Sequence, residues 1–253
     1  MNELRKFKLE PLYQSFKNNE NTYLHTAYVE ADNKVHYYTD EDVRDYSKEY
    51  FTIESLEDGN NVYWRTTVNN SGLFKTIEIS LDLGKTWNSY RSSFSDNLVA
   101  TLNKGDKLWA RGTNSAYGIS TGCSHFELSK EYIVYGNIMS IIDKDNYQNN
   151  KTLTTSYPLN RQFQNSQIIS AENLILPATT LTMGAYEYMF YNCKKLKIGP
   201  KELVNSSGGN NVYNRMFYEC TSLKTSPDIK RNKFESRDCT LMFYNSGIEE
   251  LKI

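Results

Sequence analysis

The chain of 253 residues contains 39% hydrophobic and 23% charged residues, and its net charge is −1. This composition is typical of a globular protein and excludes a disordered chain, and the length predicts one or two domains. The balanced charge argues against nucleic acid as a partner, because nucleic-acid binding draws on a clear basic excess.

Residues 1–47 are polar and charged, and they predict an N-terminal anchoring arm that orders against a partner. The segment TAYVEADNKVHYY (26–38) alternates on either side of residues 31–34, which predicts a hairpin. The residues before it are compatible with a short helix or an extended arm. They lack the apolar stretch of a secretory signal, so we expect no signal in this segment.

Residues 48–143 predict a small β-sandwich of the immunoglobulin-like (Ig-like) kind, because short alternating stretches follow one another between turn signals. In the stretch KTIEISL (75–81), the alternation places Ile77, Ile79 and Leu81 on one face. The turn signal Lys-Gly-Asp (104–106) predicts a hairpin between the strands on either side of it.

Residues 144–253 contain a repeat, which predicts a short stacked solenoid. The segments YMFYNCKKLK (188–197), RMFYECTSLK (215–224) and LMFYNSGIEE (241–250) align, and RQFQNSQIIS (161–170) is a weaker first copy. Stacking would bury one phenylalanine from each copy in a single column, formed by Phe163, Phe190, Phe217 and Phe243. It would also bring Cys193 close to Cys220, and two thiols are favoured there over a disulfide.

The stretch SLDLGKTW (80–87) has the spacing S-x-D-x-G-x-T-W, which resembles the Asp box of sialidases. Physically this pattern predicts a structural hairpin, in which an aspartate accepts turn N–H groups, a glycine takes a positive φ and a tryptophan folds back. The hydroxyl groups add hydrogen bonds to the turn. The expected hairpin residues are Ser80, Asp82, Gly84, Thr86 and Trp87.

Catalytic and metal-binding patterns are missing from the sequence. The chain has a single Asp box, and no frame groups three of its arginines around a substrate carboxylate, as a sialidase would require. It has no G-x-S-x-G, P-loop or dinucleotide motif, no C-x-x-C pair and only three scattered histidines. We therefore expect no catalytic residues, no enzyme activity, no metal and no cofactor. No stretch is long and apolar enough for membrane insertion.

A tyrosine follows the repeat phenylalanine in three copies, at Tyr191, Tyr218 and Tyr244. If the phenylalanine faces the core, the next residue faces outward, and the three rings form a stripe that is a candidate ligand-binding surface. The alternative is that these rings only cover the flank of the solenoid.

The two halves together resemble a known arrangement. The segments FTIESLEDGN, KTIEISLDLGKTW, TLNKGDKLWARG, YGNIMSII and AENLILPATTL, with the MFYNCKKL and MFYECTSL repeats, are similar to the BspA-like leucine-rich-repeat surface proteins of gut Bacteroidetes and their crAss-like phages. The resemblance covers residues 48–253. It implies domains at 48–143 (β-sandwich) and 144–253 (BspA-like leucine-rich repeat), which follow the anchoring arm at 1–47.

The resemblance also implies a function in adhesion or display. We expect a non-enzymatic structural protein of a bacteriophage virion, such as a head fibre, capsid vertex decoration or tail appendage. Residues 1–47 would bind other virion proteins of the capsid or tail, the chain would form a homo-oligomer, and the repeats would meet a host-surface or mucin glycan. The alternative is a bacterial cell-surface adhesin or glycan-binding module. A sialidase-like glycosidase is the third possibility.

Overall fold

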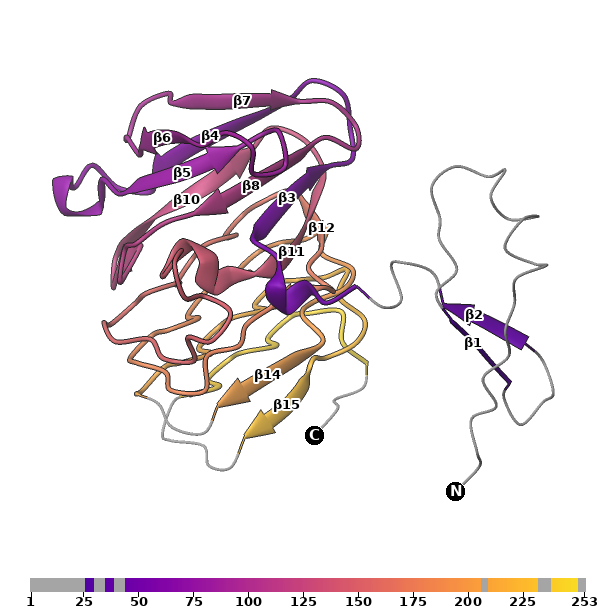
Figure 1. Ribbon diagram of the computed structural model, residues 1–253. Coiled ribbons are helices and arrows are strands. Elements are labelled where there is room, and N and C mark those ends of the chain that lie inside the picture. The colour runs from indigo at the N-terminus through magenta and orange to yellow at the C-terminus, as the bar shows by residue number, and fades with distance from the viewer. Residues whose placement is uncertain (1–25, 30–34, 39–43, 206–208, 232–237, 250–253) are drawn as a thin grey trace. The chain divides into compact units, whose positions relative to one another are not determined.

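The computed structural model describes residues 26–29, 35–38, 44–205, 209–231 and 238–249 (Figure 1). It is mainly β, with 32% strand, and the described part has no helix of seven or more residues. The chain forms two compact units, Met1–Asp45 and Tyr46–Ile253. In the first unit, β1 (Thr26–Val29) and β2 (Val35–Tyr38) pair antiparallel, which confirms the predicted hairpin. The rest of the predicted anchoring arm lies largely outside the described residues.

The second unit begins with two sheets. The four-stranded sheet, in the order β7-β4-β10-β9, contains β7 (Leu98–Leu102), β4 (Asn60–Thr66), β10 (Gly122–Leu128) and β9 (Gly118–Ile119). The seven-stranded sheet, in the order β12-β11-β3-β8-β5-β6 with β13 also paired to β11, contains β12 (Ile168–Ser170), β11 (Tyr132–Asn137), β3 (Phe51–Ser55), β8 (Lys107–Arg111), β5 (Thr76–Ser80), β6 (Asn88–Arg91) and β13 (Leu174–Ile175). Where the structure is described, the short 3-10 turns are η1 (Tyr46–Lys48), η2 (Ser71–Leu73) and η3 (Ile138–Ile141).

The two sheets share one core. In β4, buried and half-buried residues alternate, as the period of two of a strand with one face in the core requires. Phe51 of the seven-stranded sheet lies 6.3 Å from Phe126 of the four-stranded sheet, and Phe126 lies 4.8 Å from Trp64, measured between ring centroids. Burying such large rings supplies much of the hydrophobic stabilisation of a core.

Two expectations for this region are wrong. The Lys-Gly-Asp turn does not close a hairpin, because β7 pairs with β4 while β8 pairs with β3 and β5, in the other sheet. Gly105 has φ +85° and donates its N–H to the carbonyl of Ser55, so this turn carries the chain between sheets. Leu81 does not share the buried face of Ile77 and Ile79: β5 ends at Ser80, and Leu81 is 53% exposed at the start of the next turn.

The seven-stranded sheet continues directly into the repeat. Strand β11 pairs antiparallel with β3 on one side, and parallel with β12 and β13 of the first repeat copy on the other. Further along, β14 (Glu202–Asn205) pairs parallel with β15 (Asp228–Arg231), one copy apart. Figure 1 shows the copies following one another as stacked coils below the sheets. The predicted boundary at 143/144 therefore falls inside one continuous core.

The predicted phenylalanine column is present. The ring centroids of consecutive members lie 5.1, 5.3 and 5.5 Å apart, in the order Phe163, Phe190, Phe217 and Phe243. Phe51 lies 6.0 Å from Phe163, so the column starts in the core between the sheets. Beside it, the Cys193 thiol donates to the carbonyl of Phe163 at 2.7 Å and the Cys220 thiol to that of Phe190 at 3.0 Å. All four cysteines lie in the described part, and none forms a disulfide.

In each copy, residues four positions apart adopt the left-handed backbone conformation. Positive φ angles occur at Arg161 and Asn165 in the first copy, at Tyr188 and Asn192 in the second, and at the matching positions of the others: Arg215, Glu219, Leu241 and Asn245. Alternate N–H groups bond to the next copy, as from Phe163 to Met189 and from Phe190 to Met216, both at 2.9 Å. These rungs hold the copies in register, which places equivalent side chains in rows along the outer surface.

Candidate functional site

The Asp-box residues lie together in the turn that joins β5 to β6. Asp82 accepts the backbone N–H of Thr86 at 2.9 Å and its hydroxyl at 2.7 Å, and it accepts the Ser80 hydroxyl at 2.7 Å. Hydrogen bonds from Thr86, then from Ser80, lower the pKa of Asp82 to about 2. Gly84 has φ +86°, and the Trp87 indole N–H donates back to its carbonyl at 3.1 Å.

The side chains of this turn are already engaged in contacts with neighbouring residues. The Arg111 guanidinium lies 3.9 Å from the Trp87 ring centroid, and the Tyr50 ring packs against the same indole at 5.1 Å. The nearby carboxylate of Glu78 forms ion pairs with Lys144 and Arg111, each at 2.6 Å. The pKa of Glu78 is lowered, and the hydrogen bond from Lys144 is the largest cause. Asp82 is ionised and hydrogen-bonded to Thr86 and Ser80, and Glu78 is ionised and ion-paired, which suits a structural turn more than acid–base chemistry.

The three candidate tyrosines form one row on the repeat surface. The rings of Tyr191 and Tyr218 stack at 4.9 Å and 9°, and those of Tyr218 and Tyr244 stack at 4.9 Å and 20°. Tyr244 is 54% exposed and the other two are half-buried. Because the ring faces cover one another, the row presents ring edges and hydroxyl groups to solvent rather than open faces for a sugar to stack on.

A second row, two positions before the repeat phenylalanine, was not predicted from the sequence. The Arg161 guanidinium lies 4.1 Å from the Tyr188 ring centroid, and that of Arg215 lies 5.6 Å from it. Arg215 also donates to the Tyr188 hydroxyl at 2.8 Å. The buried Glu187 lies near both arginines, and burial raises the pKa of its carboxyl. The signal was available: in the repeat alignment, Arg161, Tyr188 and Arg215 share one position.

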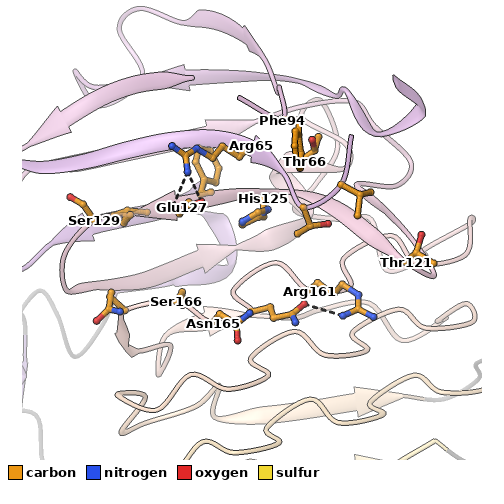
Figure 2. Close-up of a pocket in the computed structure, with 16 residues that line it drawn as sticks. Arg65, Thr66, Phe94, Thr121, His125, Glu127, Ser129, Arg161, Asn165 and Ser166 are labelled. Atoms are coloured by element: carbon orange, nitrogen blue, oxygen red, sulfur yellow. Dashed lines mark hydrogen bonds and ion pairs between the residues drawn. The ribbon is translucent and has the colours of Figure 1, made fainter. Parts of the chain in front are cut away.

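A polar cleft of about 790 Å³ lies between the four-stranded sheet and the first repeat copy. In Figure 2, Arg65, His125 and Glu127 come from the sheet, while Arg161 and Asn165 come from the repeat. Arg65 forms an ion pair with Glu127 at 3.0 Å and another with Asp96. Gln164, which lines the cleft, occupies the repeat position of Tyr191, so the repeat position of the tyrosine row reaches the cleft in the first copy. Sequence reasoning missed this cleft, since its two walls lie far apart in the chain.

The described residues contain no group of three or more His, Cys, Asp or Glu side chains that could hold a metal ion. None of the helices in the described part is long and apolar enough to cross a membrane.

Comparisons of the chain with protein-family models, with curated proteins and with solved structures found no match.

Proposed function

We propose that this chain is a non-enzymatic recognition protein that displays its repeat surface to a host-surface, glycan or mucin partner. The observation that carries the proposal is the in-register row of Tyr191, Tyr218 and Tyr244 on the outer surface of the repeat. Within the described part, no hydrogen bond occupies their hydroxyl groups. Tyrosine suits recognition because its rigid ring carries a hydrogen-bonding end at little entropic cost.

The setting that fits best is a bacteriophage particle, where the protein would serve as a head fibre, vertex decoration or tail appendage. The resemblance to BspA-like proteins, with an Ig-like sandwich followed by leucine-rich repeats, supports this setting. The division of the chain into two compact units, of which Met1–Asp45 is the first, supports an anchoring role for that unit, through contacts with capsid or tail proteins. In a homo-oligomer, each anchoring unit would bind an equivalent site on a symmetric particle. The alternative setting is the bacterial cell surface.

The recognition role is tested by passing the full-length chain over immobilised mucin and over envelopes of the host bacterium. Saturable binding to either supports the proposal, and absence of binding to both refutes it. Mass spectrometry of purified phage particles separates the two settings: stoichiometric recovery in particles supports the virion, whereas recovery only from bacterial envelopes supports the adhesin.

The anchoring role is tested by deleting residues 1–45. The deletion stops there because the Tyr46 ring packs on Tyr135 at 5.6 Å, within the second unit. We expect the shortened chain to fold and to stay off the particle. Incorporation at the normal level would show that the anchor lies elsewhere.

A fluorogenic sialoside assay tests the third possibility, a sialidase-like glycosidase, and we expect no turnover of the substrate.

A further inference from the structure

The polar cleft has the size and lining of a small-ligand site. Its volume of about 790 Å³ falls within the range of about 300–1,000 Å³ that is typical of such sites. In Figure 2, Thr121 and Arg161 lie toward one end and Ser129 and Ser166 toward the other. Phe94 lies on the rim and is 55% exposed, so its ring is available to a ligand.

Several buried polar atoms in the walls of this cleft have no hydrogen-bond partner in the described structure. They are Nδ1 of His125, Nε of Arg65, Oγ1 of Thr66 and Nε of Arg161. A buried donor or acceptor without a protein partner costs about 1–3 kcal/mol, and a water, an ion or another bound molecule can supply the missing hydrogen bond. Burial lowers the pKa of His125, so its ring is neutral.

Charge is distributed unevenly along the cleft. Arg65 is neutralised by Glu127 and Asp96. Arg161 forms no ion pair with any described residue: its guanidinium donates only to the side-chain oxygen of Gln164 at 3.0 Å and to the Ser120 carbonyl at 3.4 Å. Glu187 acts on Arg161 electrostatically without pairing with it. The Arg161 end is therefore positive, and the end near Glu127 offers carboxylate acceptors.

We propose that this cleft binds the acidic sugar of a glycan, with the sugar carboxylate on Arg161, its hydroxyl groups on Glu127 and Gln164, and an apolar ring face against Phe94. A planar guanidinium donates to a carboxylate through two parallel hydrogen bonds, which suits this end of the cleft to a carboxylate. The inference rests on the proposed recognition role. It adds that the glycan chain continues from the cleft onto the tyrosine row, beginning at the position of Gln164.

Isothermal titration of the full-length chain with sialyllactose and with digalacturonate tests the proposal, with lactose as the uncharged control. We expect both acidic sugars to bind and lactose to bind at least about tenfold more weakly. Arg161→Asn should lower the affinity for both acidic sugars by about tenfold or more and leave lactose unchanged. Asparagine is chosen because it tolerates the positive φ of 59° at this position.

Arg215→Asn is the matched control, because Arg215 has the same repeat position, a positive φ of 50° and a contact with Tyr188, but does not line the cleft. It should change the affinity for the acidic sugars by no more than about twofold, whereas a tenfold loss corresponds to about 1.4 kcal/mol of binding free energy. Phe94→Ala, at an exposed side chain, should weaken both acidic sugars while the fold is retained. It keeps the test valid if Arg161→Asn fails to fold.

The proposal is overturned if neither acidic sugar binds the wild-type chain, or if Arg161→Asn and Phe94→Ala both bind as wild type does. It is also overturned if Arg215→Asn loses as much affinity as Arg161→Asn. If the full chain binds mucin or host envelopes and the acidic sugars do not compete, the recognition role stands and the cleft assignment falls. If it binds neither, both fall.

Discussion

At the scale of single residues, the Asp box holds the β5–β6 turn by hydrogen bonds among eight consecutive residues, such as those from Thr86 to Asp82 and from Trp87 to Gly84. These are the roles that the pattern S-x-D-x-G-x-T-W predicts. Local hydrogen bonds of this kind depend on nearby chain geometry alone. The repeat alignment already carried the arginine–tyrosine row. The polar cleft depends on contacts between distant segments, so the sequence could not place it.

Asp82→Asn should loosen the β5–β6 turn and lower the melting temperature at neutral pH, because asparagine cannot accept both hydrogen bonds from Thr86 on carboxylate oxygens. The pKa of Asp82 is lowered, so its contribution is fully present above the ordinary pKa of 3.8 and is lost as pH falls through about 2. Thermal melts of both proteins across this range check the prediction. A difference between them that is as large at pH 2 as at neutral pH would contradict the account.

Glu219→Asn should stabilise the chain. Glu219 has φ +57° at a position where the other three copies carry Asn165, Asn192 and Asn245. Asparagine tolerates this left-handed conformation better than glutamate does. Asn192 already donates its side-chain amide to Asn165 at 2.8 Å, while its own buried Oδ1 has no partner in the described structure. An asparagine one copy further along would donate to that oxygen.

We expect a gain of about 1 kcal/mol, seen as a rise in melting temperature of about 2–4 °C. Glu219→Gln is the control, because it removes the charge but keeps the unfavourable backbone preference. An equal gain from both substitutions would mean that charge, rather than backbone conformation, limits stability at this position.

At the scale of elements, the sequence pattern predicted which segments repeat but not how the turns connect the sheets. The same residue types satisfy a hairpin and an inter-sheet turn, because both need a left-handed residue such as Gly105. The choice between them is made by Ser55, far away in the chain, whose carbonyl accepts the Gly105 N–H. The phenylalanine column was predictable because a recurring spacing of 27, 27 and 26 residues between phenylalanines is typical of stacked repeats.

Phe190→Ala should be among the most damaging changes in the repeat. Phe190 is fully buried between Phe163 and Phe217, so its removal leaves a cavity with rings on both sides and should cost about 3–5 kcal/mol. Phe243→Ala should cost clearly less, because that ring is only partly buried and the described column places one ring against it. Urea titrations of both variants check this order. Equal losses would show that the column does not carry the stability of the repeat.

At the scale of the whole molecule, the two sheets and the repeat form one structural unit. Strand β11 pairs with β3 and with β12, and Phe51 packs on Phe163, so neither half keeps a complete core without the other. The change of pattern near residue 144 is a change of period, from alternating strands to 27-residue copies. Such a change marks a new kind of element, but it carries no information on whether the cores are separate.

Residues 46–253 should therefore unfold in a single cooperative transition. Fluorescence of the tryptophans reports the sheets, since Trp64, Trp87 and Trp109 all lie before the repeat, while circular dichroism reports the whole unit. We expect the two signals to give the same urea midpoint. Two separated midpoints would show that the repeat folds independently.

The recognition role is tested most directly by replacing Tyr191, Tyr218 and Tyr244 together with phenylalanine and measuring binding of the full-length chain to mucin and host envelopes. The ring faces already cover one another, so phenylalanine keeps the stacking and removes only the outward hydroxyl groups. We expect an unchanged melting temperature and a loss of binding of about tenfold or more. Tyr90→Phe, on β6, serves as control and should bind normally. Undiminished binding by the triple variant would contradict the account.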